Sequence, residues 1–406
     1  MSTATSATTS SVKPAPYRWV VLLLCWASFT LTSVDRSTWG PASSAVGDSW
    51  HVPLAALGIF ATCYYIGYVV SNAAGGFLTD WLGSRLVLGI SMFASGALMI
   101  VFGSTTSIPL GLAVQGLVGL FAGVDFSAGL KLITTWLPAS ELGLASGIFM
   151  TATSLGTLIA NAVVPTLIQH TDWGASYHLF GGITVAVGVL CLLFLRNGTV
   201  TTGVIRRVLP DLRPLLRNRD LLLLGLAGFG GLWGTYGFVT WSNTLMIKGH
   251  HISPVDAGIV VVIFSGVAVL AKPIVGWVTD RLGLGQRVPI MVILVLFTAA
   301  LLVFGAMRSY GGFLAVAPVL GIAAYAYSPL TAAMIPRLTG AGLTGSAAGG
   351  VNAVWQLGSV LVPAAVGPLF QATGSFYAAF VLLAVGPLLG AVALIGARDD
   401  RPQVSH

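Results

Sequence analysis

The chain has 406 residues, of which 56% are hydrophobic and only 8% are charged, with a mean hydropathy of +0.91. Soluble globular chains carry about 25% charged residues, so this composition excludes a soluble protein. Uninterrupted apolar runs of about 20 residues or more exclude a transmembrane β-barrel and indicate membrane-spanning helices.

We expect twelve membrane-spanning helices joined mostly by short turns, an all-α membrane fold. In chain order they are predicted at 17–40, 53–78, 86–105, 108–136, 142–169, 175–196, 220–247, 254–279, 288–307, 310–336, 343–370 and 375–397. The basic, proline-broken stretch 197–219 is predicted to be a cytoplasmic linker between two six-helix bundles, 17–196 and 220–397. Residues 1–16 and 398–406 are expected to be cytoplasmic tails, the first of them disordered.

Basic residues are distributed unevenly about these spans. Of the 19 Lys and Arg residues, 14 fall on one side of the membrane, two on the other (Lys248 and Arg308) and three within the spans (Arg36, Lys131 and Lys272). An excess of Lys and Arg marks the cytoplasmic side. Both termini are therefore expected in the cytoplasm of a cell-membrane protein, and the net charge of +7 does not indicate a nucleic-acid-binding protein.

The sequence contains few residues of the kinds that enzymes use for catalysis. Its single glutamate, Glu141, lies in a predicted cytoplasmic turn, and the chain contains no arrangement typical of a nucleophile with its base or of a metal cluster. We therefore expect no enzymatic activity, no metal and no cofactor, and we expect a monomer.

Two adjacent charges, Asp35 and Arg36, interrupt the first predicted helix. A charge at the centre of a membrane helix costs about 2.5 to 3.5 kcal/mol on insertion scales, and neighbours on a helix point about 100° apart, so the two do not neutralise each other. One interpretation ends this helix at Val34 and places the pair among the lipid headgroups. We favour burial inside a helical bundle, because Trp39 and Pro41 lie beyond the pair and intramembrane charges usually mark an ion or substrate path.

The turns that follow the second and eighth predicted helices share a pattern. Gly76-Phe-Leu-Thr-Asp80-Trp-Leu-Gly83-Ser-Arg85 recurs 200 residues later as Gly276-Trp-Val-Thr-Asp280-Arg-Leu-Gly283-Leu-Gly-Gln-Arg287. A second repeat, at an offset of 202 residues, links the fifth and eleventh predicted helices. Two parallel halves of six helices are a transporter architecture with the substrate site between the halves.

The pattern Gly-x-x-x-Asp-x-x-Gly-x-Arg resembles the signature loop of the major facilitator superfamily, and the resemblance covers essentially the whole chain. It implies a cytoplasmic gate made by Gly76, Asp80, Gly83, Arg85, Gly276, Asp280 and Arg287. The carboxylate and guanidinium of each turn would cap a helix end on the opposite half, with Asp80 near Leu343 and Asp280 near Leu142. Such a carboxylate gains about 0.3 to 1 kcal/mol at a helix N-terminus, which suits a latch that opens again. The alternative is simple anchoring of the turn at the interface.

The fourth predicted helix carries Asp125 and Lys131. We expect Arg36 to pair with Asp125 across helices one and four. Asp35 is then the less compensated carboxylate and the favoured proton carrier, because burial disfavours the charged form of a carboxyl group; Asp125 is its rival.

The Asp-Arg pair and the run Lys131-Leu-Ile-Thr-Thr-Trp136-Leu-Pro138 resemble the anion:cation symporter family, proton-driven importers of organic acids. This resemblance implies coupling at Asp35, binding of a substrate carboxylate at Arg36, and a place for Lys131 beside the substrate path. In the eighth helix, Lys272-Pro-Ile-Val-Gly276-x-x-x-Asp280 resembles a run of monocarboxylate and oxalate transporters whose base binds a carboxylate. It implies that Lys272 does so as a point charge. The alternative is that Lys272 extends to the cytoplasmic interface.

Other polar and aromatic side chains of helices seven, ten and eleven are weaker candidates for stacking on a ligand or bonding to it. They are Tyr236, Trp241, Tyr325, Tyr327, Asn352 and Gln356. The tyrosines of helix two, Tyr64, Tyr65 and Tyr68, are interpreted as helix packing.

Three intramembrane cations against two acids leave an excess positive charge, which favours an anionic substrate. We predict a secondary transporter of a small organic carboxylate, coupled to protons, whose halves rock within the lipid bilayer about a central site. The alternatives are an anion exchanger and a drug or metabolite efflux antiporter, although the fifth predicted helix lacks the Gly-Pro-x-x-Gly-Gly run usual in such antiporters. We do not expect a nutrient sensor, which commonly appends a long cytoplasmic segment.

Overall fold

The computed structural model describes residues 16–138, 141–197, 218–281, 285–339 and 344–397. These residues form α-helices joined by turns, and twelve helical segments are long and apolar enough to cross a membrane. The predicted all-α class with twelve membrane spans is therefore confirmed. The predicted tails and most of the predicted linker lie outside the described residues.

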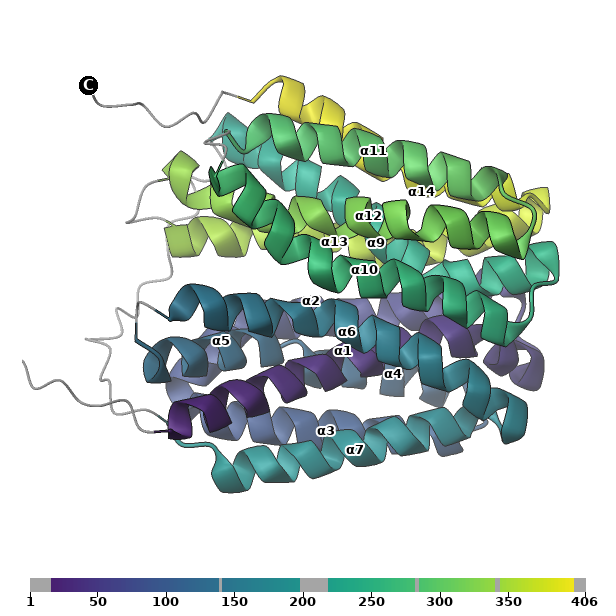
Figure 1. Ribbon diagram of the computed structural model, residues 1–406. Coiled ribbons are helices and arrows are strands. Elements are labelled where there is room, and N and C mark those ends of the chain that lie inside the picture. Colours follow the sequence, from purple (N-terminus) through teal and green to yellow (C-terminus); the bar gives the residue numbers. More distant parts are fainter. Residues whose placement is uncertain (1–15, 139–140, 198–217, 282–284, 340–343, 398–406) are drawn as a thin grey trace, which may run out of the picture.

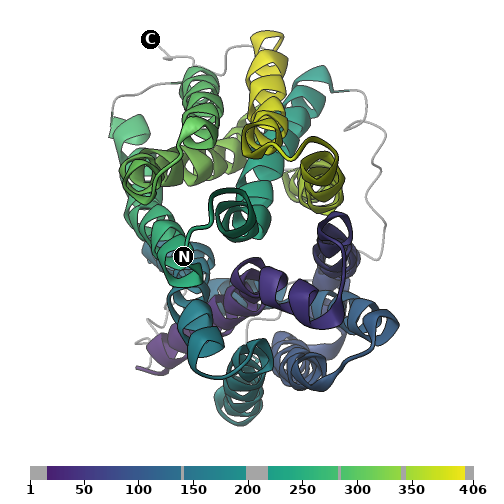
Figure 2. The same ribbon diagram turned by 90° about the vertical axis from the view of Figure 1, so that its right-hand side faces the viewer.

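The helices form two groups that lie side by side, and Figure 2 views them end-on (Figures 1 and 2). The first bundle contains α1 (Tyr17–Trp50), α2 (Leu54–Leu82), α3 (Ser84–Ser104), α4 (Ile108–Ala122), α5 (Asp125–Trp136), α6 (Leu142–His170) and α7 (Trp173–Phe194). The second contains α9 (Arg219–His250), α10 (Pro254–Arg281), α11 (Arg287–Ala306), α12 (Tyr310–Thr339), α13 (Thr344–Thr373) and α14 (Phe376–Ile395). We call the end where α1 and α9 finish the outer end, because the charge bias predicts that it faces the outside.

Two helices differ from the prediction in a way that affects the site. The first does not end near residue 40 but continues as α1 to Trp50, with Pro41 inside it. Proline is tolerated in membrane helices because neighbouring groups satisfy the freed backbone carbonyl. The predicted helix 108–136 is divided into α4 and α5 by a short turn at Gly123 and Val124, so that Asp125 begins α5.

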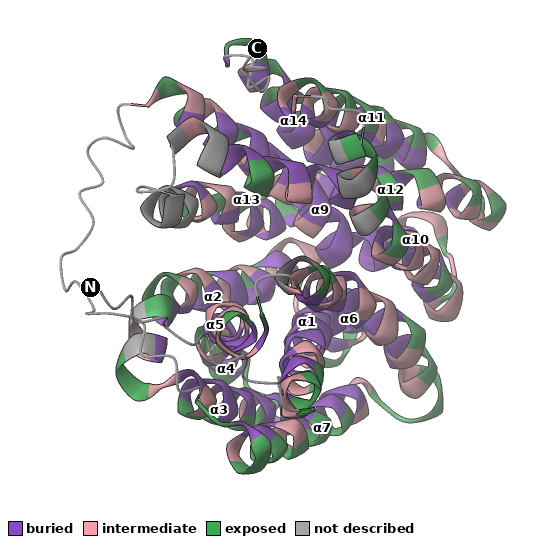
Figure 3. Cartoon of the chain, turned by 60° about the vertical axis from the view of Figure 1, so that its left-hand side comes forward, coloured by how far each residue is buried: buried purple, intermediate pink, exposed green. Residues whose placement is uncertain are grey.

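The outward faces of the helices are apolar. Large side chains such as Leu193, Leu270 and Ile395 are exposed, and Figure 3 shows exposed residues along the outside of both bundles. Hydrocarbon covers such faces in a bilayer, which is consistent with the predicted lipid partner.

The internal repeat is visible at the inner ends of the bundles. Arg85 Nε donates to the carbonyl oxygen of Leu192 at 2.9 Å, and Arg287 Nε donates to that of Leu394 at 2.8 Å. Each guanidinium therefore caps the C-terminal end of the last helix in its own bundle, where a positive charge is favourable. These contacts of Arg85 and Arg287 lie within each half, and the expected capping of helices of the opposite half stays a prediction.

Part of the predicted gate is visible. Gly83 ends α2 with φ of +83°, a conformation that favours glycine. The side chains of Asp80 and Asp280 and the position of Gly276 against its neighbours lie outside the described residues, so the contacts predicted for the two carboxylates stay predictions.

At the outer end the bundles touch backbone to backbone. A Cβ atom at Gly58 of α2 would lie 1.8 Å from the carbonyl oxygen of Pro363 in α13, and one at Gly258 of α10 would lie 2.5 Å from that of Asn161 in α6. The two contacts join equivalent positions of the two halves. Small residues permit this close approach of membrane helices, and they close the outer end of the interface.

Candidate functional site

Arg36 lies inside the protein at the interface of the two bundles. Its side chain is 9% exposed, and its Cζ atom is 4.9 Å from the ring centroid of Tyr236 in α9 and 5.9 Å from that of Tyr68 in α2. Nη2 donates to Ser33 Oγ at 3.4 Å. Because α1 continues well past this residue, the interpretation that places the Asp35–Arg36 pair among headgroups is wrong.

A small pocket adjoins this guanidinium. Its volume is about 10 Å³, roughly the room that one water molecule needs. It is lined by Arg36, Trp39, Gly40, Ala61, Tyr64, Tyr65, Gln115, Val239 and Thr240. Arg36 Nε and the hydroxyl of Tyr64 are buried here, and neither has a hydrogen-bond partner among the residues that the structure describes. Unsatisfied buried donors are rare and costly, so they point to a group that the pocket can receive.

Lys272 lies on the second bundle and reaches the first. Its Nζ atom is 4.5 Å from the ring centroid of Tyr325 in α12 and donates to Thr153 Oγ1 of α6 at 2.5 Å. It is also close enough to Arg36 for the two positive charges to interact. Lys272 thus points toward the middle of α12 and α6, and the alternative that it extends to the cytoplasmic interface is wrong.

The two intramembrane acids are held by hydroxyl groups of the first bundle. Asp125 is fully buried and accepts from Ser28 Oγ at 2.8 Å and from Thr32 Oγ1 at 2.5 Å, one donor on each oxygen. Asp35 is 4% exposed and accepts from one hydroxyl, Thr184 Oγ1 of α7, at 3.2 Å to each oxygen.

The expected ion pair between Arg36 and Asp125 is therefore wrong. Asp125 faces Ser28 and Thr32, whereas Arg36 faces the aromatic rings between the bundles. Within the described ranges, neither acid forms an ion pair, so both buried carboxyl groups lack a cationic partner.

Lys131 is placed elsewhere. Its Nζ atom donates to the carbonyl oxygen of Thr79 at 3.0 Å, near the inner end of α2. Tyr68, the α2 residue beside Arg36, lies about 16 Å farther out along that helix at 1.5 Å per residue. The structure does not bring Lys131 to the other two cations, and its predicted contact with a substrate stays a prediction.

The weaker candidates divide into two groups. Tyr236 and Tyr325 lie against the two cations, and Asn352 Nδ2 donates across the interface to Asn72 Oδ1 at 3.3 Å. The remaining three bond within the second bundle. Trp241 donates to the Pro363 carbonyl at 3.0 Å, Tyr327 shares a hydrogen bond with Thr235, and Gln356 accepts from Ser359.

The tyrosines of α2, which the sequence predicts to be helix packing, also belong to the surroundings of Arg36. Tyr65 packs on Tyr236 with ring centroids 5.2 Å apart, and Tyr68 lies over Arg36. Their spacing along the helix, Tyr64, Tyr65 and Tyr68, puts them on one face, and that periodicity was a usable signal. Thr153 and Thr184 lie in apolar helices far from their partners in sequence, and nothing near them marks their role.

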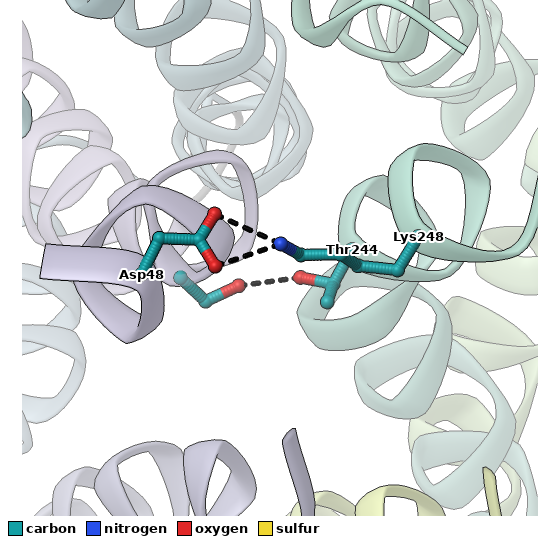
Figure 4. A network of polar contacts seen from close by, with 4 residues as sticks. Asp48, Thr244 and Lys248 are labelled. Carbon is teal, nitrogen blue, oxygen red and sulfur yellow. Dashed lines mark hydrogen bonds and ion pairs between the residues drawn. The ribbon is translucent and has the colours of Figure 1, made fainter. Parts of the chain in front are cut away.

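Equivalent positions of the two halves face each other along α1 and α9, which we call the α1–α9 seam. Arg36 meets Tyr236, and Asp48 meets Lys248, each at an offset of 200 residues. Between them, a Cβ atom at Gly40 would lie 2.5 Å from the carbonyl oxygen of Val239. The seam therefore runs along the axis that relates the halves, from the central guanidinium to the outer ion pair shown in Figure 4.

Comparisons with known proteins agree with this architecture. A family model described as "Major Facilitator Superfamily" matches residues 25–363 and 243–406. The chain is 24% identical over 286 residues to the chloroplastic ascorbate transporter of Arabidopsis thaliana. The alignment covers 66% of this chain and 53% of the plant protein, so the chain spans about half the length of that relative. It is 21% identical over 419 residues to the D-galactonate transporter of Escherichia coli, covering 95% of this chain and 96% of that protein.

Among solved structures, the chain resembles a bacterial homologue of the human lysosomal transporter Spinster in an inward-facing, unoccupied conformation. The TM-score is 0.76 at 14% identity, over 94% of this chain and 95% of that chain. At this level of identity the likeness concerns the fold.

Proposed function

Since the chain belongs to the Major Facilitator Superfamily, we propose that it carries a small organic carboxylate across the membrane by alternating access, coupled to protons. The two bundles rock about a central site, which opens to one side of the membrane at a time. The names of two relatives, transporters of ascorbate and of D-galactonate, denote organic anions and support an anionic substrate.

The observation that carries the proposal is the buried guanidinium of Arg36. Among the described residues it has aromatic rings and one hydroxyl as neighbours and no acidic partner. A cation–π contact contributes about 0.5 to 2 kcal/mol, which compensates only part of the cost of an unpaired buried charge. A carboxylate offers a guanidinium two charge-assisted hydrogen bonds, so an organic acid satisfies this site better than a neutral or cationic ligand does.

Lys272 provides the second contact, from the opposite bundle. Its ammonium group also rests on a tyrosine ring and on uncharged oxygen atoms. An anion held between Arg36 and Lys272 relieves the repulsion between the two cations. It also joins the two bundles, which favours the closed arrangement of the central site.

We assign the coupling proton to Asp35. A buried carboxyl group without a cationic partner favours its neutral form unless hydrogen-bond donors stabilise the charge. Asp125 has two hydroxyl donors at short distance, whereas Asp35 shares one hydroxyl at 3.2 Å between its two oxygens. Asp35 is therefore the less stabilised carboxylate and the better proton carrier, with Asp125 as the alternative.

Coupling follows from the cost of closing the site over unneutralised charge. With Asp35 ionised and Arg36 empty, occlusion would take both charges out of water at a cost of several kcal/mol per ion. A proton on Asp35 and an anion on Arg36 remove both penalties. Both ligands then favour the same occluded state, and this shared preference links the two fluxes.

Thermal stability of the purified wild-type protein tests the anion preference. We test a panel of three acids, D-galactonate, succinate and benzoate, and expect at least one of them to raise the melting temperature, since a ligand at 100 times its Kd stabilises the folded state by about 2.7 kcal/mol. The amides of the same acids are the matched controls, because they keep the shape and lose the charge. Equal stabilisation by acids and amides would contradict the proposed carboxylate site.

A further inference from the structure

The outer end of the α1–α9 seam carries an ion pair that the central site does not use. Lys248 Nζ donates to both carboxylate oxygens of Asp48 at 2.8 Å. Closer to the centre, the hydroxyl groups of Ser43 and Thr244 share a hydrogen bond of 2.6 Å, and Figure 4 shows both contacts crossing from α1 to α9. This pair joins the two bundles, in contrast to the ion pair of Arg18 with Glu141, which lies within the first bundle.

The ion pair is too exposed to contribute much to holding the two bundles together. Its side chains are 38% exposed at Lys248 and 66% exposed at Asp48. An exposed ion pair contributes about 0 to 1 kcal/mol. The backbone contacts at Gly58 and Gly258 already hold the bundles together at this end. Another carboxylate can therefore replace Asp48 on Lys248 at little cost.

The position of Lys248 suits a ligand that arrives from outside. It faces a cavity of about 260 Å³, large enough for a small organic acid. The cavity is lined by Ser44, Gly47, Asp48, Val52, Leu54, Leu57 and Lys248. Along α9, Lys248 lies about 18 Å outward of Tyr236, the residue that faces Arg36, at 1.5 Å per residue. Arg308, the other basic residue predicted outside, lies between α11 and α12 and not on the seam.

We propose that Lys248 is an outer binding site for the carboxylate of the transported anion, and that Asp48 occupies this site while the outer end is closed. This proposal rests on the proposed function. When the bundles part at the outer end, Lys248 separates from Asp48, and an incoming carboxylate accepts the same two hydrogen bonds. When they close again, the carboxylate of Asp48 returns, repels the anion from Lys248, and leaves Arg36 as the next cation along the seam.

Two conservative substitutions separate this role from that of a simple latch. Lys248→Gln and Asp48→Asn both remove the ion pair and keep a polar side chain. If the pair only holds the outer end shut, the two variants weaken it equally, and the KM for uptake from outside shifts in the same direction in both. An outer anion site predicts opposite shifts, because one variant loses the cation and the other loses the group that competes for it.

The measurement is the initial rate of uptake into proteoliposomes, with the labelled panel acid that most stabilises the wild-type protein. We expect KM for external acid to rise about tenfold in Lys248→Gln and to fall in Asp48→Asn, because electrostatic attraction of a charged ligand changes its capture by about tenfold or more. Ser44→Cys is added to each of the two variants, and the rate at which an impermeant thiol reagent modifies this cysteine checks that both variants open the outer end alike. KM shifts of the same sign would overturn the outer site and leave the proposed function intact. Absence of uptake of every panel acid by the wild-type protein would remove both.

Discussion

Replacing Arg36 by methionine is expected to lower kcat/KM for uptake of an organic acid at least about 30-fold. Truncating one partner of a buried, hydrogen-bonded charge pair costs about 2 to 5 kcal/mol, and 1.4 kcal/mol corresponds to a factor of ten. Arg36→Lys keeps the charge and loses the bidentate geometry, so its uptake rate should lie between those of the wild-type protein and Arg36→Met. The measurement is initial uptake of the labelled panel acid into proteoliposomes containing equal amounts of each protein.

The Arg36→Met variant should fold well, and its unchanged stability distinguishes loss of a substrate contact from loss of a structural contact. In the described structure Arg36 has no acidic partner, so methionine removes an uncompensated buried charge and leaves none behind. We expect an unchanged or higher melting temperature without ligand. Arg308→Met, the same substitution at an exposed arginine, is the control and should transport normally. Retained uptake in Arg36→Met, or lost uptake in Arg308→Met, would contradict the assignment.

Replacing Asp35 by asparagine is expected to abolish accumulation driven by a pH gradient while sparing exchange. Asparagine resembles the protonated carboxyl group, so the variant can bind and carry the anion but cannot release a proton. Exchange of labelled for unlabelled acid across proteoliposomes should stay within about threefold of the wild-type rate, since the neutral side chain removes the penalty of an unneutralised charge. Accumulation above equilibrium should disappear.

Asp125→Asn is the matched comparison, because it makes the same change in the other buried carboxyl group. Ser28 and Thr32 already stabilise the charge of Asp125, so we expect this variant to keep gradient-driven accumulation. If accumulation is lost in Asp125→Asn and kept in Asp35→Asn, the coupling proton belongs to Asp125 instead.

Much of the fold was predictable because a membrane helix can be recognised from its own local sequence. A long apolar run can satisfy its backbone in a bilayer only as a helix, so the apolar runs along the sequence predict twelve spans, and the repeated turn predicts two halves. The extension of α1 to Trp50 was missed, since Pro41 and the polar residues beyond it are typical of a helix end in water. Their burial against the second bundle is a property of the assembled fold.

The partners of the buried charges were harder to predict than the charges themselves. Opposite charges predicted a pair between Arg36 and Asp125, but Ser28 and Thr32, one helical turn apart on α1, present two hydroxyls to Asp125. That spacing was visible in the sequence. The contact of Asp35 with Thr184 joins helices at opposite ends of the first bundle's sequence, and no local pattern indicates it.

The central site also depends on the meeting of the two halves. Equivalent positions of α1 and α9 face each other, which follows from the 200-residue offset once the halves are known to be related by an axis between these helices. The aromatic surroundings of Arg36 come from Tyr68 and Tyr236, one from each bundle. Sequence alone identified the charged residues and, as weaker candidates, Tyr236 and Tyr325; the structure added Tyr68 and the hydroxyl groups that hold the charges.

Uptake driven by an imposed pH gradient is the most direct test of proton-coupled carboxylate transport. Purified wild-type protein is placed in proteoliposomes, the labelled panel acid is added, and the outside is made acidic relative to the lumen. We predict accumulation above the outside concentration, abolished by a protonophore. Uptake that is the same with and without the gradient would contradict the coupling, and absence of uptake of every panel acid would contradict carboxylate transport itself.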